Sequence, residues 1–402
     1  MRDALTVALW LNMVQILTSM AIIAVPVMAP AIAADLGVGT ESLGTYTAIV
    51  WCGALAVLFV AGQLSARFGA LRVSQMCLFM CGAGLLLAGS VSAQGSAPSL
   101  TLAVLAATGA VMGLGYGAET PTSSQLLARV SPPRHQALIF SLKQTGVQIG
   151  GMLAGVVFPA MVAWVGWRHT LLASGAVLLA ATIPMELPRR RFEPDPRTYA
   201  GGPAHTFAQA FMQMLRDWRV LRLAIASAAY VSAQICLGTF LVSYLVAERG
   251  TSLAFAGSIL ALSQAGGLIG RVGWGAIARR MLGARAVLTL IGAAIVVCAA
   301  LLGTFGTTVP VPVLALVCFV FGLTAAGWNG LHLAEVARLA PPGQVAQVIG
   351  ATFILGMLGL ILAPLAFGAI AAVSSYGTAY VAIGGLSVVG ILVMAPVTRR
   401  WR

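Results

Sequence analysis

The sequence predicts an all-α membrane protein with twelve transmembrane helices in two pseudo-symmetric six-helix bundles, with both termini in the cytoplasm. Three observations support this prediction: the hydropathy of the chain, the number of its apolar runs, and a repeat that relates its two halves. Of the 402 residues, 59% are hydrophobic and only 8% are charged, and the mean hydropathy is +0.96. A water-soluble chain of this length needs a polar outer layer, so the predicted solvent is lipid.

The apolar runs are about twenty residues or longer, which is the length that spans a bilayer. Six of them cover 6–33, 43–66, 73–94, 99–126, 136–165 and 168–186, and six more cover 220–247, 252–278, 285–306, 310–335, 345–371 and 376–397. The first run is too long for the core of a signal peptide, so we interpret it as a retained helix.

The two sets of six runs predict three parts of the chain. An N-terminal bundle over 1–186 and a C-terminal bundle over 220–402 are joined by a polar linker over 187–219. Within the linker, aromatic and apolar residues recur at helical spacing beside arginines, at Phe207, Phe211, Leu215 and Trp218. This pattern predicts an interfacial helix on the cytoplasmic membrane surface, and a plain linker is the alternative.

The basic residues orient the helices. Nineteen of the twenty-three lie in alternate loops on the side of both termini, whereas the opposite loops contain only Arg168 and Arg249. By the positive-inside rule the arginine-rich side is cytoplasmic, which predicts a multi-pass protein of the inner membrane. The net charge of +13 is therefore attributed to topology, and no nucleic-acid partner is expected.

Motifs for metal binding and catalysis are absent from the sequence. None of the six cysteines shows a CxxC or Cys/His spacing, so no metal and no other cofactor is expected. The chain contains no HExxH motif, no GxSxG motif and no nucleophile–base pair. We therefore predict that the protein is not an enzyme.

An internal repeat connects the two halves. The segment GLGYGAETPTSSQLLARVSPP at Gly113–Pro133 aligns without a gap with GLTAAGWNGLHLAEVARLAPP at Gly322–Pro342. A weaker similarity relates GQLSARFG at Gly62–Gly69 to GAIARRMLG at Gly275–Gly283. Because these units recur in the same order within each set of six helices, they indicate a duplicated six-helix bundle.

Twelve helices, a cytoplasmic central linker and these repeats resemble the major facilitator superfamily over the whole chain. The superfamily signature between helices 2 and 3 is Gly-x-Leu-x-Asp-Arg/Lys-x-Gly-Arg/Lys-Arg/Lys. Its matching positions here are Gly62, Leu64, Arg67, Gly69 and Arg72, while Ala66 stands where the family usually has aspartate. The resemblance implies a major facilitator fold, a monomer, and gating roles for the arginines of the two related loops, Arg67, Arg72, Arg279 and Arg280.

Two segments narrow the resemblance to organic-anion carriers. GRVGWGAIARR at Gly270–Arg280 resembles the helix 8 arginine segment of monocarboxylate and oxalate–formate transporters. SLKQTGVQIGG at Ser141–Gly151 is similar to helix 5 of carriers related to cyanate permeases. The helix 1 lysine of monocarboxylate transporters is missing, since the polar residues there are Asn12, Gln15 and Thr18.

Three ionisable residues are predicted to lie at one depth in the membrane. Glu119, Lys143 and Arg271 are eight to ten residues from the nearest cytoplasmic arginine along their helices. At about 1.5 Å per residue, this places them roughly 12–15 Å deep, near the middle of a hydrocarbon core of roughly 30 Å. A buried charge is expected to face a wet cavity or a partner. The layer carries a net positive charge, which suits an anion that Arg271 and Lys143 bind.

These considerations select the candidate site residues. The candidates for substrate binding are Lys143, Arg271, Gln144, Gln264, Trp328, Asn329, Tyr116 and Gln15, and those for proton coupling are Glu119 and His332. For Lys143, the alternative is a permanent ion pair with Glu119 that only ties two helices together. For Arg271 the alternative is a side chain that reaches towards the cytoplasmic surface, and for His332 it is a packed or gate-lining residue.

The predicted function is secondary active transport of a small organic anion, a carboxylate, across the inner membrane by alternating access with proton symport. The expected partners are the anion, protons and the lipid bilayer. Proton-driven export of drugs or other small molecules is one alternative, although helix 5 lacks the Gly-Pro pair usual in such exporters. A transporter-like membrane sensor is a second one, which the short tails disfavour.

Overall fold

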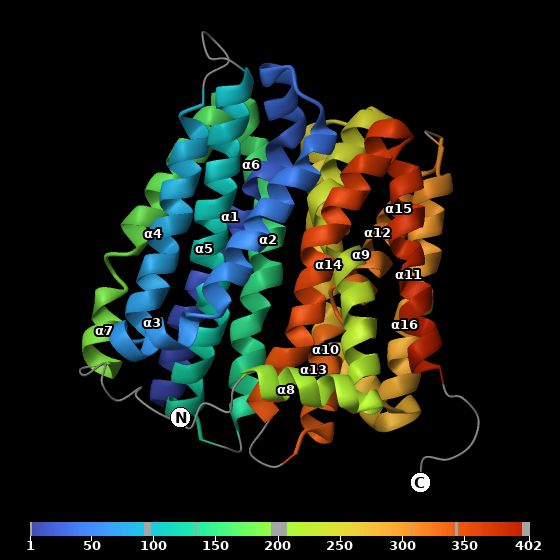
Figure 1. The fold of residues 1–402 in the computed structure, drawn as a ribbon. Coiled ribbons are helices and arrows are strands. Elements are labelled where there is room, and N and C mark those ends of the chain that lie inside the picture. The colour runs from blue at the N-terminus through green and yellow to red at the C-terminus, as the bar shows by residue number, and fades with distance from the viewer. Residues whose placement is uncertain are drawn as a thin grey trace. The chain divides into compact units, whose positions relative to one another are not determined.

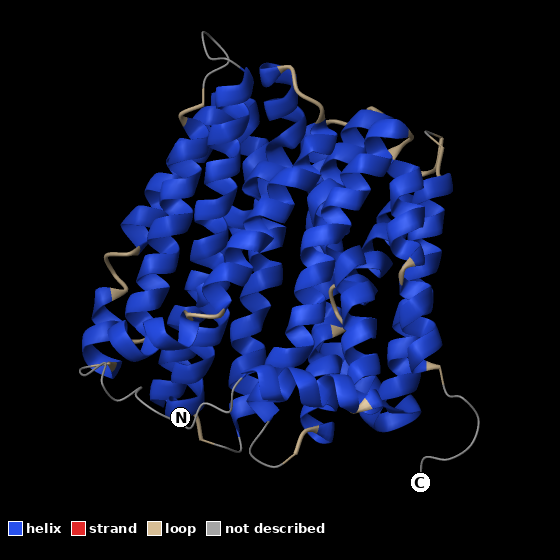
Figure 2. Cartoon of the chain, in the orientation of Figure 1, coloured by secondary structure: helices blue, strands red, loops and turns tan. Residues whose placement is uncertain are grey.

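The computed structural model describes residues 2–91, 98–132, 135–193, 207–306, 308–341 and 345–395. These residues form helices joined by short loops and contain no β-strand (Figure 2). The chain folds as two compact units. The first is Met1–Gly202 with Leu245–Ala247 and Thr251–Ala261, and the second is Pro203–Tyr244 with Glu248–Gly250 and Leu262–Arg402.

The helices follow one another along the chain as labelled in Figure 1. The first half contains α1 (Arg2–Leu36), α2 (Leu43–Leu58), α3 (Ala61–Phe68), α4 (Ala70–Gly89), α5 (Pro98–Val130), α6 (Gln136–Ala181) and α7 (Glu186–Phe192). The second contains α8 (Phe207–Arg216), α9 (Trp218–Arg249), α10 (Leu253–Ile277), the π-helical turn η4 (Ala278–Leu282), α11 (Gly283–Thr304), α12 (Val311–Ala325), α13 (Asn329–Leu339), α14 (Val345–Val373), α15 (Tyr376–Gly385) and α16 (Ser387–Met394).

The described residues contain helices within each of the twelve predicted runs. Ten stretches of the described residues are long and apolar enough to cross a membrane. One of them, Ile139–Phe192, holds two membrane-length helices and the short α7, because Gly166 adopts φ 76° inside α6 and turns the chain. The 33-residue α5 is a further long helix.

Three predicted helices are interrupted where the sequence predicted continuous ones. The run 310–335 divides into α12 and α13, 43–66 into α2 and α3, and 376–397 into α15 and α16. Hydropathy does not detect these breaks because the residues at them are apolar or small. The break between α12 and α13 spans Ala326, Gly327 and Trp328, and it adjoins a candidate site.

Helix α8 forms within the predicted linker and contacts α14 of the same unit. Its position on the membrane surface stays a prediction, as do the predicted limits of the bundles.

Close helix packing builds the first unit. Helix α1 packs along α6, and α2 and α4 both pack against α5. Small residues allow the approach: a Cβ added at Gly146 would lie 2.9 Å from both the Asn12 carbonyl oxygen and Gln15 Cβ. Another at Gly150 would lie 2.8 Å from Ser19 Cβ. Glycine at these positions therefore brings the polar face of α1 against the α6 segment that carries Lys143.

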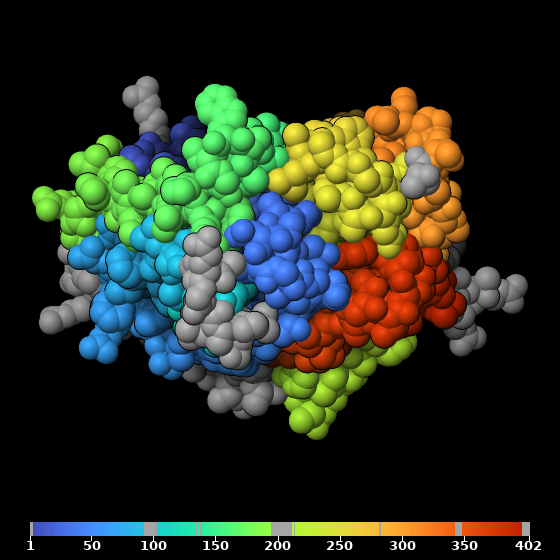
Figure 3. All heavy atoms as spheres, turned by 90° about the horizontal axis from the view of Figure 1, so that it is seen from above, coloured from blue at the N-terminus to red at the C-terminus, as the bar shows by residue number. Residues whose placement is uncertain are grey.

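A polar contact joins two helix ends of the first unit. Figure 3 shows the chain from above, coloured from blue at the N-terminus to red at the C-terminus. Trp167 Nε1 and Arg168 Nη2 donate to Asp35 Oδ2 over 3.1 and 3.0 Å. These bonds join the end of α1 to the turn at Gly166. The predicted non-cytoplasmic loops of helices 1 and 5 thus meet at this end.

Candidate functional site

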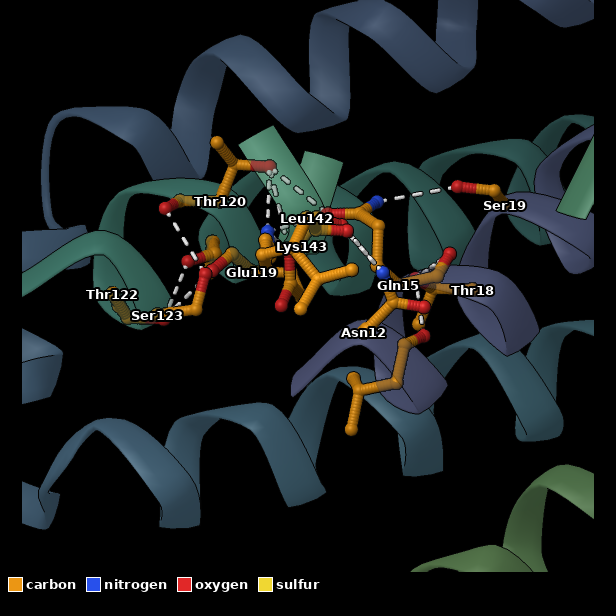
Figure 4. Close-up of polar contacts among 12 residues, drawn as sticks. Asn12, Gln15, Thr18, Ser19, Glu119, Thr120, Thr122, Ser123, Leu142 and Lys143 are labelled. Carbon is orange, nitrogen blue, oxygen red and sulfur yellow. Dashed lines mark hydrogen bonds and ion pairs between the residues drawn. The ribbon is translucent and has the colours of Figure 1, made fainter. Parts of the chain in front are cut away.

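Lys143 is the centre of a buried polar cluster in the first unit. Only 2% of its side chain is exposed, and its ammonium donates to Glu119 Oε2 over 2.5 Å and to Gln15 Oε1 over 2.6 Å. A longer contact of 3.4 Å reaches Thr120 Oγ1. Figure 4 shows these three side chains converging on Lys143 from α1 and α5. The structure thus brings together three of the predicted residues, Lys143, Glu119 and Gln15.

The Glu119 carboxylate is bonded through one oxygen. Its side chain is 0% exposed, and Oε2 accepts from Lys143 and, over 3.4 Å, from the Thr120 hydroxyl. Oε1 has no hydrogen-bond partner among the residues that the structure describes. A buried carboxylate depends on its cation for stability.

Asn12 fixes the backbone around Lys143. Its Nδ2 donates to the Leu142 carbonyl over 2.5 Å, to the Lys143 carbonyl over 3.2 Å and to Thr145 Oγ1 over 3.2 Å. The sequence singled out Asn12 as polar but assigned it no role, and Thr120 was missed although it directly follows Glu119. The signal for both residues is a polar side chain within a long apolar helix.

Tyr116 and Gln144 lie near this cluster along the chain. Tyr116 is one turn before Thr120 on α5, and its ring packs edge-on against Trp51 of α2 with centroids 5.8 Å apart. Gln144 follows Lys143 on α6 and is half-buried. Their substrate-binding roles stay predictions.

The candidates of the second unit gather at the break between α12 and α13. Arg271 Nε on α10 donates to the Ala326 carbonyl over 3.2 Å, and Asn329 Nδ2 donates to Gln234 Oε1 over 3.3 Å. The first intrahelical bond of α13 runs from His332 N to the Trp328 carbonyl. The amides of the first turn of α13 therefore have no acceptor within the helix itself, and a helix N-terminus of this kind favours a negative charge nearby. Gln264 lies seven residues before Arg271 on α10 and is half-buried.

Trp328 and His332 are packed against each other. Their rings are 5.3 Å apart in an edge-on arrangement, and Trp328 also contacts Tyr230 at 6.0 Å. His332 is 5% exposed. This environment is typical of the packed histidine that the sequence left as an alternative, and proton coupling through His332 stays a prediction.

The predicted gating arginines lie at helix ends. Arg67 lies over the Phe68 ring at 5.2 Å, and Arg72 pairs with Glu186 at 3.6 Å. Arg279 and Arg280 are exposed in the π-helical turn η4. Their gating roles stay predictions.

Glu193 is a residue that sequence reasoning missed. Its two carboxylate oxygens accept from the Ala70 and Leu71 amides, each over 2.7 Å, at the start of α4. The side chain is buried. It thus places an acid beside Gly69, three residues after Ala66, which stands in α3 instead of the usual aspartate. The carboxylate also stabilises the positive end of α4.

A family model described as Major Facilitator Superfamily matches residues 11–364. Among curated proteins, the chain is 28% identical over 163 residues to a 4-hydroxybenzoate transporter PcaK of Pseudomonas aeruginosa, covering 40% of this chain and 35% of that protein. It is 26% identical over 278 residues to the PcaK of Pseudomonas putida, covering 62% and 60%. It is 24% identical over 273 residues to a probable sulfoacetate transporter SauU of Cupriavidus necator, covering 64% and 60%. These matches span about a third to three fifths of the relatives' length.

Solved structures agree in fold over nearly the whole chain. A D-xylose-proton symporter matches with a TM-score of 0.74 at 17% identity, covering 98% of this chain and 97% of that one. A peptide transporter POT in complex with sulfate matches with a TM-score of 0.76 at 16% identity, covering 98% and 94%. Because the family model covers most of the sequence, the chain belongs to the Major Facilitator Superfamily, and it is a multi-pass membrane transporter rather than an enzyme.

Proposed function

We propose that this transporter imports a small organic anion, a carboxylate, across the inner membrane by alternating access together with a proton. The observation that carries the proposal is the Lys143 ammonium, 2% exposed and paired with Glu119 over 2.5 Å. A buried cation with one carboxylate partner is a site at which a second carboxylate can compete.

The proposed cycle uses this competition. The substrate carboxylate replaces Glu119 as the partner of Lys143, while Gln15 continues to accept from the ammonium, as it does over 2.6 Å in the structure. Glu119, whose side chain is 0% exposed, then takes up a proton because a buried carboxylate without a cation is unstable. Release of the anion restores the ion pair and expels the proton, which couples the two fluxes.

Arg271 supplies a separate cationic group in the second unit. A guanidinium can bind a carboxylate through two parallel hydrogen bonds. The first turn of α13 lies close to α10 at this residue, because a Cβ added at Gly330 would lie 3.2 Å from the Arg271 carbonyl oxygen. The relatives support an anionic substrate, because 4-hydroxybenzoate, gallate and sulfoacetate, which their names state, all carry an acid group. The compounds to test are these three acids together with oxalate and formate, which the resembling carriers transport.

The test is uptake into proteoliposomes of 4-hydroxybenzoate, gallate, sulfoacetate, oxalate and formate, with and without an inward acid gradient. We expect saturable uptake of one of these anions by the wild type and a loss of at least tenfold in Lys143→Met, with partial activity in Lys143→Arg. Arg168→Gln, at the pair with Asp35, is the matched control for loss of a cation. Equal uptake by Lys143→Met and the control would overturn the role of Lys143 in anion binding. The ion pair would then serve only to hold two helices together.

A further inference from the structure

Three backbone carbonyls at the break between α12 and α13 are bonded by side chains. The Leu323 carbonyl accepts from Trp274 Nε1 over 2.8 Å, and the Ala325 carbonyl accepts from Trp328 Nε1 over 2.9 Å. The Ala326 carbonyl accepts from Arg271 Nε over 3.2 Å. In a continuous helix these oxygens would accept from the amides four residues later.

A break at this depth requires such donors. Within a membrane, irregular backbone persists only where its polar groups are satisfied by protein or by a water-filled cavity. Two indoles and one guanidinium meet that requirement here. No bond from the Gly327 amide to the Leu323 carbonyl occurs among the described residues, so the indole of Trp274 occupies the acceptor that Gly327 would use to continue α12.

Helix α10 lies directly against the break. A Cβ at Gly327 would lie 2.7 Å from Gly270 Cα, and one at Gly270 would lie 3.0 Å from Gly327 Cα. The two backbones are therefore in contact, which explains how two side chains of α10 reach carbonyls of the opposite helix. Arg271 and Trp274 are three residues apart and share one face of α10.

The three donors differ in one property. Trp274 and Trp328 are neutral, so no net charge attracts an anion to them and away from their carbonyls. Arg271 is charged, and its bond to Ala326 orients a group that our proposed function assigns to the anion. The orientation of Arg271 therefore depends on where the Ala326 carbonyl points, and that depends on the break.

We propose that Trp274 is a positioning residue of the anion site in the second unit. By holding the Leu323 carbonyl, it keeps α12 from extending through Gly327 and leaves the Ala326 carbonyl directed at Arg271. The inference rests on the proposed function because it takes Arg271 as an anion ligand. Trp274 itself touches no substrate in this scheme.

The test replaces Trp274 with phenylalanine, which keeps a ring and removes the N–H donor. Trp164→Phe, at a tryptophan that is 90% exposed, is the matched control. With 4-hydroxybenzoate as the probe, we expect Trp274→Phe to raise the apparent Kd and KM about three- to tenfold with kcat nearly unchanged. Incorporation of benzothienylalanine at 274, which has the shape of tryptophan without the N–H, should reproduce the effect.

A double-mutant cycle shows whether Trp274 acts through Arg271. We expect the effect of Trp274→Phe on Kd to disappear in an Arg271→Gln background, because there is no guanidinium left to orient. An equal loss in both backgrounds would overturn the positioning role. If Arg271→Gln alone binds the probe as well as the wild type, the proposed role of Arg271 as an anion ligand fails, and the inference fails with it.

Hydrogen exchange measured by mass spectrometry tests the break without any substrate. We expect the amide of Gly327 to exchange more slowly in Trp274→Phe than in the wild type, since the Leu323 carbonyl becomes available to it. Unchanged or faster exchange would show that Trp274 does not hold the break open. A wild type that binds none of the five anions would overturn the proposed function, whereas the exchange comparison would still decide whether Trp274 holds the break open.

Discussion

The Lys143 ammonium lies 2.5 Å from Glu119 Oε2, and both side chains are withdrawn from the surface of the first unit. Asn12 donates to the Lys143 backbone carbonyl, and Gln15 accepts from the ammonium, so α1 bonds to both the backbone and the side chain of this lysine. The pair thus links α1, α5 and α6 through polar contacts, and it is also a candidate transport site. These two roles make different predictions.

Removal of one partner of this ion pair should be costly. We expect Lys143→Met to lower the free energy of unfolding in detergent by about 3 kcal/mol, because it leaves the Glu119 carboxylate buried without its cation. The double variant Lys143→Met with Glu119→Leu should recover most of this loss, since it leaves no uncompensated charge. Denaturation followed by circular dichroism measures both values. Equal instability of the single and double variants would contradict the assignment of the cost to the lone charge.

Glu119→Gln should separate transport from the proton gradient. Glutamine cannot take up and release a proton as a carboxylate does, so an inward acid gradient should no longer drive accumulation. Exchange of labelled for unlabelled anion should continue within a fewfold of the wild-type rate. The measurement is uptake and counterflow in the same proteoliposomes. Gradient-driven accumulation that persists in this variant would place the coupling proton elsewhere, with His332 the next residue to replace.

Gly146 should tolerate no larger residue. Its added Cβ would lie 2.9 Å from the Asn12 carbonyl oxygen, so Gly146→Ala should push α1 away from α6 and destabilise the protein by about 1–3 kcal/mol. Gly356→Ala is the control, since nothing lies within 4 Å of its added Cβ. There we expect stability to be unchanged or higher by up to about 1 kcal/mol, because alanine is the better helix former. A similar loss in both variants would exclude close packing as the cause.

Glu193→Ala should loosen the start of α4. The substitution removes the acceptors of the Ala70 and Leu71 amides, which we expect to cost about 1 kcal/mol, as loss of a helix cap does. Hydrogen exchange should accelerate at those two amides and stay unchanged at the far end of α4 around Leu85. Protection that is unaltered at Ala70 and Leu71 would show that the cap contributes nothing to local stability.

The sequence predicted the number of long helices because a membrane span needs about twenty apolar residues, and that requirement is visible in composition alone. It also predicted that Lys143 and Glu119 lie at one depth, because each is nine or ten residues along its helix from an arginine of the predicted cytoplasmic side. It missed Glu193, since an acid in a polar linker gives no sign of which helix start it will reach. It missed Trp274 for a related reason, because a tryptophan in an apolar helix is indistinguishable from an ordinary packing residue.

The repeat shows which features the sequence determines and which the tertiary structure determines. By itself the sequence established that Gly113–Pro133 and Gly322–Pro342 are related segments, and their alignment places Trp328 at the position of Glu119. Only the tertiary structure decided that α5 runs through this position without a break while the second copy stops at Ala325 and restarts at Asn329. The physical reason is that a backbone polar group within a membrane loses one hydrogen bond only where another donor or acceptor replaces it. Helix α5 has its own amides as donors, whereas Trp274 and Arg271 of a neighbouring helix offer the second copy a different set.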